Sequence, residues 1–166
     1  MKLYIRQKVF SWGDRFYVKD ELGNNRYTVQ GEVFSFGKKL HIYDASGSEA
    51  AFIQQKVFSF LPRFFVYIGG RQAAEIVKEF TLFFPCYRVD GPGWSVSGQF
   101  LAHDYEIKQG SRTVAAIRKA WMTWGDSYEL NISDTADEVM ALAAVLAIDA
   151  VMESDGAAVN VNVNTN

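Results

Sequence analysis

Apolar residues follow one another without a break in a single stretch near the end of the chain. Residues 139–148 read VMALAAVLAI, and most of them are good helix formers. Successive residues of a helix point about 100° apart, so the large side chains of this stretch point in well-separated directions and leave no polar face. A helix of this kind must be buried on all sides, and the remainder of the fold has to surround it.

Upstream of this stretch, apolar and polar residues alternate in short segments separated by turn sequences. Such alternation predicts half-buried β-strands, and turns such as 23–25 (GNN) and 90–93 (DGPG) favour hairpins between them. About twelve strands are predicted, at 3–5, 15–19, 26–29, 39–43, 50–54, 64–68, 72–78, 86–89, 94–97, 104–108, 113–119 and 127–132.

One motif returns along the chain. The sequence QKVFSW at 7–12 recurs as QKVFSF at 55–60, and each copy is followed by a strand that begins Arg-Phe-aromatic-Val. A third echo relates 11–18 to 123–130. Because these echoes extend from the first strands to the last, they favour one architecture over two separate domains.

The number of predicted strands and the apolar helix point to the same architecture. Twelve strands with open edges would invite aggregation, whereas a closed antiparallel sheet has no edges. A barrel of that size is too wide for side chains alone to fill, and a buried helix fills it. The sequence therefore predicts a mainly β (α+β) domain over 1–153, a closed antiparallel β-barrel of ~12 strands that encloses a central hydrophobic helix at about 134–153.

Charged residues mark the predicted ends of the helix. Ser133 or Asp134 is expected to cap its N-terminus, and Glu138 complements the helix dipole there. Asp149 lies near the C-terminus, where the dipole disfavours negative charge, so we expect a cation or backbone N–H groups to hold it at the barrel rim. The alternating Val and Asn residues of 154–166 are predicted to form a disordered C-terminal tail.

The charge balance and the cysteine content narrow the function classes. The chain has 17 Lys and Arg against 19 Asp and Glu, a net charge of −2, which gives no bulk attraction to nucleic acid. The single cysteine, Cys86, excludes an internal disulfide framework and is typical of a reducing compartment. The ten-residue apolar run is too short to cross a bilayer, which needs roughly 20 such residues. A cytoplasmic protein without a transmembrane segment is expected.

Several stretches carry a resemblance to a known family. They are 31–37 (GEVFSFG) with 40–44 (LHIYD), 96–100 (VSGQF) with 104–107 (DYEI), and 114–119 (VAAIRK), which continues through Trp124, Asp126, Ser127 and Tyr128 to the apolar helix. These residues resemble the LURP-one-related family, which includes YxjI-like bacterial proteins and belongs to the Tubby C-terminal-like superfamily. The resemblance covers roughly residues 1–153 and implies a twelve-stranded antiparallel barrel around a C-terminal helix, the fold that the residue pattern also predicts.

The resemblance also suggests a class of function. Relatives in the superfamily include phospholipid scramblases and Tubby domains, which bind phosphoinositide headgroups through basic residues. The implied function is that of a non-enzymatic binding or scaffold protein that recognises anionic phospholipid headgroups on its outer barrel surface, peripherally at the membrane. The candidate ligand-binding residues are Arg6, Lys8, Lys38 and Lys39. The alternative is a protein–protein interaction or stress-response module without lipid affinity.

Residues with catalytic or metal-binding chemistry are few. The two histidines, His41 and His103, have no partners at metal-ligand spacing, so neither a metal nor a cofactor is expected. His41 lies between two apolar strand residues and should face away from the core. His103 and Asp104 are neighbours on a strand and should point to opposite faces, which disfavours an acid–base pair. Cys86 is interpreted as a small buried hydrophobe. No enzymatic activity is expected.

The chain is rich in aromatic residues whose role the pattern leaves open. They are interpreted mainly as lining of the core around the helix, with a hydrophobic ligand pocket as the other possibility: Phe34, Phe36, Phe58, Phe60, Phe83 and Phe84. Trp12 and Trp124 each precede Gly-Asp and are expected to pack the barrel end. Tryptophans that were exposed there would suit a membrane interface.

Overall fold

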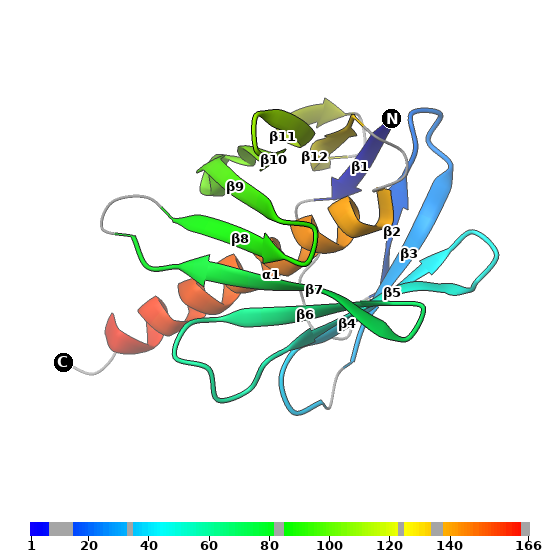
Figure 1. The fold of residues 1–166 in the computed structure, drawn as a ribbon. Coiled ribbons are helices and arrows are strands. Elements are labelled where there is room, and N and C mark those ends of the chain that lie inside the picture. The colour runs from blue at the N-terminus through cyan, green and yellow to red at the C-terminus, as the bar shows by residue number, and fades with distance from the viewer. Residues whose placement is uncertain (7–14, 33–34, 82–84, 123–124, 134–137, 164–166) are drawn as a thin grey trace.

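The fold is a closed β-barrel with a helix running through it (Figure 1). The computed structural model describes residues 1–6, 15–32, 35–81, 85–122, 125–133 and 138–163. For residues 6, 121, 122, 125, 126 and 154–163 it describes the backbone alone.

Each strand of the barrel is hydrogen-bonded to its neighbours in the chain, and the barrel closes where the first strand pairs with the last. All neighbouring strands are antiparallel, and the described strands are β1 (Lys2–Arg6), β2 (Arg15–Lys19), β3 (Asn25–Gly31), β4 (Lys39–Asp44), β5 (Glu49–Gln55), β6 (Arg63–Ile68), β7 (Arg71–Glu79), β8 (Cys86–Asp90), β9 (Trp94–Gln99), β10 (Asp104–Gln109), β11 (Arg112–Met122) and β12 (Gly125–Ile132). A short 3₁₀ helix, η1 (Phe100–Ala102), connects β9 to β10. The predicted barrel fold is confirmed, and each predicted strand coincides with an observed one.

Strand alternation places one set of side chains inside the barrel and the other outside. In β4, Leu40 and Ile42 are buried, whereas His41 and Tyr43 face outward and are partly exposed. The same alternation is seen in β2 and β6. The inner side chains together form one apolar lining, and the outer set is free to make polar contacts.

The helix α1 (Glu138–Val163) fills the barrel. Its residues 141–148, 150 and 151 have no solvent exposure, and it lies against β5, β6, β7 and β12. The helix is longer than the sequence predicts, because the backbone stays helical past residue 153 to Val163. Nothing in 154–163 forbids a helix, since proline is absent there and one glycine inside a helix costs only about 1 kcal/mol.

Contacts of the barrel wall hold the residues on either side of the predicted helix start. Residues 134–137, including Asp134, lie outside the described residues, so the predicted cap at Ser133 or Asp134 stays a prediction. The hydroxyl of Ser133 donates to the carbonyl oxygens of Thr113 (2.5 Å) and Val114 (2.7 Å), so its side chain is bound to β11. Glu138 accepts hydrogen bonds from Arg26 (3.1 Å) and from the hydroxyl of Tyr27 (2.8 Å), so the barrel wall holds the first turn of α1.

The two ends of the barrel are unlike each other. At one end, here called the turn end, tight turns such as 20–24 and 45–48 join the strands, and α1 begins there. At the other, the loop end, lie the segments that follow β3, β5, β7 and β9, with described residues 35–38, 56–62, 80–81 and 100–103. The side chain of Lys38 contacts Glu153 (3.1 Å), so α1 leaves the barrel at the loop end, at the lower left of Figure 1.

Substitutions in the buried helix should act on folding. Leu146→Ala should lower the free energy of unfolding by roughly 2–5 kcal/mol, because it leaves a cavity in a filled barrel. Leu146→Asp should unfold the domain, since an unpaired charge would be buried. Denaturant unfolding measures both effects, and Leu22→Ala, at an 86% exposed position of the turn end, is the matched control. A folded, stable Leu146→Asp protein would show that the helix is not buried as described.

Candidate functional site

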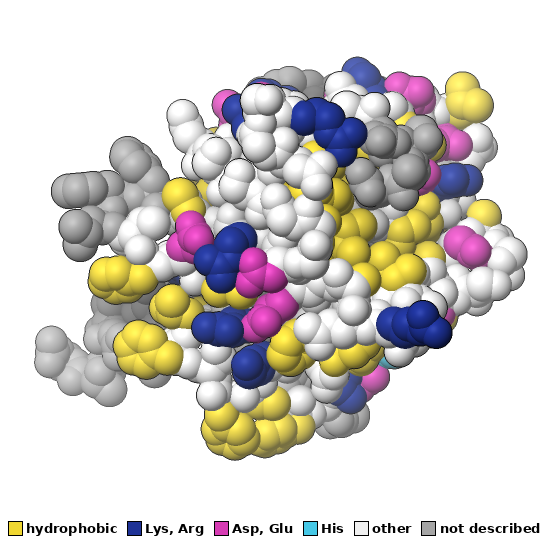
Figure 2. Space-filling view, in the orientation of Figure 1, with side chains coloured by type: hydrophobic (Ala, Val, Ile, Leu, Met, Phe, Trp, Pro, Cys, Tyr) yellow, Lys and Arg dark blue, Asp and Glu magenta, His cyan; other side chains and the backbone are white. Residues whose placement is uncertain are grey.

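At the loop end, several large apolar side chains are exposed to solvent. Five of them are 72–98% exposed and come from four separate segments of that end: Phe36, Phe58, Phe60, Phe80 and Leu101. In Figure 2, hydrophobic side chains gather along the lower-left and bottom margin, the side on which Figure 1 shows α1 leaving the barrel. An exposed apolar cluster of this kind marks an interaction surface.

This finding corrects the interpretation of three aromatic residues. Phe36, Phe58 and Phe60 were expected to line the core, but the core is already filled by α1 and the inner faces of the strands. They lie in loops, where strand alternation no longer directs a side chain inward. The other aromatics of that prediction, Phe34, Phe83 and Phe84, lie outside the described residues, as do Trp12 and Trp124.

Backbone hydrogen bonds fix the two loops that carry Phe36 and Phe58. The backbone N–H of Gln55 donates to the carbonyl of Lys38 (2.7 Å), and the N–H of Lys38 donates to the side chain of Gln55 (3.0 Å). Phe58 adopts a left-handed backbone conformation (φ 60°), which is uncommon for a bulky residue. Its ring meets that of Phe36 at 5.8 Å. The two loops therefore present their rings together.

Basic residues lie among these loops. The ammonium group of Lys56 rests over the ring of Phe65 at 5.6 Å, and no carboxylate of the described residues pairs with it. Arg63, on the opposite side of the same loop, is paired with Glu75 at 3.1 Å. Lys56 thus provides a positive charge in the loop that carries Phe58, two residues before it in the chain.

Of the candidate residues of the sequence analysis, Lys38 and Lys39 have described side chains, and these two point in different directions. Lys38 points along the helix and contacts Glu153 and the carbonyl of Ala150 (3.4 Å), while Lys39 points to the outer face. Partial burial lowers the pKa of Lys38, and the contact with Glu153 offsets part of that effect. Arg6 ends β1, three strands away in the barrel, and its side chain is not described. Lys8 lies outside the described residues.

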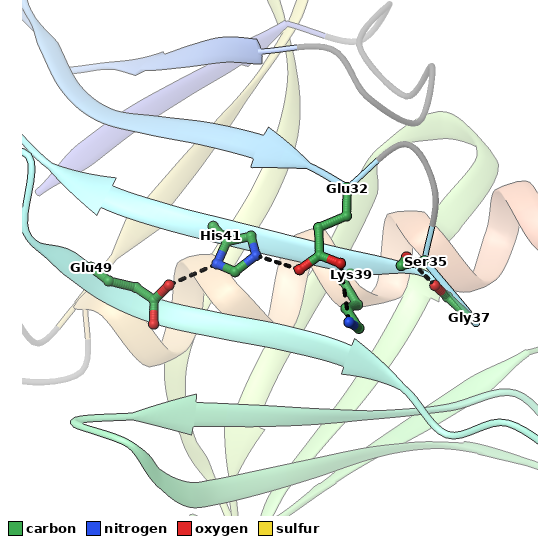
Figure 3. Close-up of polar contacts among 6 residues, drawn as sticks. All are labelled: Glu32, Ser35, Gly37, Lys39, His41 and Glu49. Atoms are coloured by element: carbon green, nitrogen blue, oxygen red, sulfur yellow. Dashed lines mark hydrogen bonds and ion pairs between the residues drawn. The ribbon is translucent and has the colours of Figure 1, made fainter.

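The outer face of β4 carries an ionic network around His41 (Figure 3). The ring nitrogens of His41 lie 2.7 Å from a carboxylate oxygen of Glu49 and 3.0 Å from one of Glu32, and Lys39 contacts Glu32 at 3.0 Å. Partial burial lowers the pKa of His41, but the hydrogen bonds to the two glutamates outweigh it and raise that pKa above its usual value. The predicted outward orientation of His41 is confirmed.

A second group of titratable residues is buried inside the barrel. The hydroxyl of Tyr128 donates to Oδ2 of Asp149, and Nε2 of His103 lies 3.8 Å from Oδ1. The expectation that a cation or backbone N–H groups hold Asp149 is therefore wrong, because the phenol of a neighbouring strand holds it. Burial raises the pKa of Asp149 to about 7, the hydrogen bond from Tyr128 lowers it, and the charge of Glu153 raises it further.

The other candidate residues lie apart. His103 faces inward, whereas Asp104 faces outward and pairs with Arg118 at 2.8 Å, so the predicted separation of the two side chains is confirmed. Burial lowers the pKa of His103, and the charge of Lys119 lowers it further. Cys86 is only partly buried, which corrects its interpretation as a core residue.

A shallow hollow of about 480 Å³ lies on the outer face of β2, β3 and β4, and its lining extends from the turn at 45–47 to Arg15, the first residue of β2. Arg15, Tyr17, Arg26 and Tyr43 are among the residues that line it. Arg26 is engaged by Glu138, and the guanidinium of Arg15 donates to the amide oxygen of Gln30 at 2.9 Å. Since its contact with Gln30 is neutral, Arg15 keeps a charge that an anion could use.

Comparisons with known proteins agree with the fold. The family model described as LURP-one-related matches residues 1–149, and the chain belongs to this family. It is 32% identical over 155 residues to the uncharacterised protein YxjI of Bacillus subtilis (strain 168), covering 93% of this chain and 96% of that protein. An X-ray structure of a protein from Arabidopsis thaliana is similar in fold, with a TM-score of 0.61, 17% identity and 90% of each chain covered.

Within the described residues, no helix has both the length and the apolar character needed to cross a bilayer. No group of three or more His, Cys, Asp or Glu side chains in that same part of the chain is arranged to hold a metal ion.

The His41 network predicts a pH dependence of stability. The pKa of His41 in the folded state lies above its usual value of 6.5, so its contribution to stability is fully present below about pH 6.5 and is lost as the pH rises through the folded-state pKa. We expect the wild type to exceed His41→Gln in unfolding free energy at acidic pH and the difference to shrink at alkaline pH. Urea unfolding across this range measures the difference, and a constant difference would contradict the role of the network.

Proposed function

We propose that this member of the LURP-one-related family is a non-enzymatic cytoplasmic binding protein that docks on anionic phospholipid membranes through its loop end. One observation carries the proposal: five large apolar side chains of that end are 72–98% exposed, whereas at the turn end Leu22 is the one described large apolar side chain exposed to that degree. The contrast indicates a surface that is covered in the functional state.

The arrangement of these side chains favours a membrane over a protein partner. The rings project from separate loops, and Phe60 and Phe80 are 98% and 79% exposed. A protein partner would have to offer a shaped pocket for each projecting ring, whereas the interface of a bilayer accepts rings at any position. Aromatic side chains are enriched at that interface.

Electrostatic attraction supports the same partner. Apolar insertion and attraction to anionic lipids act together in proteins that bind membranes peripherally. Lys56 supplies a cation in the loop that carries Phe58, and Lys39 and Arg63 lie close to the same end, each beside a glutamate. The net charge of −2 provides no general attraction, so binding should depend on this local charge and on its orientation.

The double variant Phe58→Ser/Phe60→Ser tests the proposal by flotation with vesicles of phosphatidylcholine, with and without phosphatidylserine. The wild type should float with the anionic vesicles at low salt and less at high salt, because salt screens the attraction. Full burial of two phenylalanines is worth roughly 3–6 kcal/mol, so the double variant should bind at least about tenfold more weakly. Leu22→Ser, a matched exposed substitution at the turn end, should bind like the wild type.

Two further variants locate the site. Lys56→Gln should keep the apolar contribution and reduce the salt dependence. Arg15→Gln, in the outer hollow, should leave binding unchanged; if it abolished binding while the phenylalanine variant bound normally, the headgroup site would lie in the hollow and not at the loop end. A wild-type protein that floats with neither kind of vesicle would contradict the proposal and favour a protein–protein interaction module.

A further inference from the structure

A cluster of buried polar side chains lies inside the barrel near the loop end. Asp149 is 7% exposed, and its Oδ1 has no hydrogen-bond partner among the described residues; the hydroxyl of Tyr105 is in the same situation. Buried polar groups in native proteins normally have hydrogen-bond partners, so the lack of a partner for these two atoms needs an explanation. Both belong to the cluster that also contains Tyr128 and His103.

His103 links this cluster to η1. Its ring stacks on Tyr128 at 4.5 Å, and its own backbone has a left-handed conformation (φ 48°), with the N–H donating to the carbonyl of Phe100. In the same short helix, Phe100 packs on Tyr105 at 4.8 Å while Leu101 is 91% exposed. Any movement of the imidazole would therefore be transmitted to an apolar residue of the docking surface.

The residues that follow Asp149 in α1 make a second contact with the loop end. The carbonyl of Ala150 and the carboxylate of Glu153 both hold the ammonium group of Lys38, which follows the loop of Phe36. The end of α1 thus touches two docking segments, η1 through His103 and the loop of 35–38 through Lys38.

We propose that Asp149 and His103 form a proton-operated latch of the loop end, in which the protonated carboxyl holds α1 against η1 and loss of the proton to solvent releases them and weakens docking. The regulatory consequence rests on the proposed function. In the protonated form, Oδ1–H can donate to Nε2 of neutral His103 and close the 3.8 Å separation. In the ionised form, a negative charge is left in an apolar barrel, and no Lys or Arg of the described residues pairs with it.

The surrounding charges favour release after ionisation. The groups that face Asp149 are Tyr128 on β12, Tyr105 on β10, His103 just before β10, and Glu153 on α1. Glu153 forms an ion pair with Lys38. Tyr87 on β8 faces Tyr105, and Lys119 on β11 acts on His103. Glu153 is the nearest group of like charge, and burial raises the pKa of Asp149 to about 7, so the transition falls near neutral pH.

Hydrogen exchange of the full-length protein in the absence of vesicles tests the latch directly. After correction for intrinsic rates, the open population of segments 100–103 and 149–153 should rise roughly ninefold between about pH 6 and about pH 8, in step with an ionised fraction that grows from about 10% to about 90%. Asp149→Asn cannot ionise, so its exchange should not depend on pH. His41→Gln, which changes a surface histidine, should keep the wild-type transition.

A second variant keeps the test decisive if Asp149→Asn fails to fold. Tyr128→Phe removes the hydrogen bond that lowers the pKa of Asp149, so the midpoint of the exchange transition should move to higher pH. A merely structural role of Tyr128 would change protection at every pH and leave the midpoint in place. An unmoved midpoint, or a wild type without a transition, would overturn the latch.

Flotation with phosphatidylserine vesicles at the same pH values separates the latch from the docking proposal. Wild-type binding should fall as the pH rises from about 6 to about 8, and the binding of Asp149→Asn should not. An exchange transition without binding to vesicles at any pH would support the latch and contradict the membrane proposal. Binding of wild type that does not change with pH would contradict the latch as a regulator and leave the docking surface intact.

Discussion

The structure depends on the burial of a helix that has no polar side over residues 139–148. Every side chain of 141–148 is completely buried, so the helix can exist in water only inside a wall that is apolar on its inner face. A closed barrel supplies such a wall without open strand edges. Because α1 fills the interior, we expect recognition to use the outer face or one of the two ends.

Two carboxylates of α1, one near each end of the barrel, make the ends behave differently. Glu138 is held at the turn end by the guanidinium of Arg26 and the hydroxyl of Tyr27, so its charge is neutralised where it is buried. Asp149 is held at the loop end by a phenol and faces an imidazole, and no Lys or Arg of the described residues pairs with it. Burial of this carboxylate raises its pKa to about 7, so it takes up a proton close to neutral pH. The end with long loops is therefore the end whose packing can respond to pH.

The fold could be predicted from the sequence because its determinants are local. Alternation in short segments gives the strands, the apolar run gives the helix, and closure follows from their number. The site could be predicted only in part. Phe58 and Phe60 have apolar side chains, and residue type alone favours burial; their position after the alternation of β5 ends was the available signal. The contact of Tyr128 with Asp149 depends on how the helix is rotated inside the barrel, which no local pattern contains.

The magnitudes favour reversible docking. Complete burial of the five exposed side chains of the loop end would contribute roughly 8–15 kcal/mol. Association costs about 4–15 kcal/mol in lost translational and rotational freedom, and rings inserted only into the interface region are incompletely buried. The surplus is small, so a local charge such as that of Lys56 decides whether the protein is bound under given conditions. Such a surface would respond to modest changes, and in the proposed latch the loss of one proton at Asp149 loosens two of the segments that carry the exposed apolar side chains, which is a change of sufficient size.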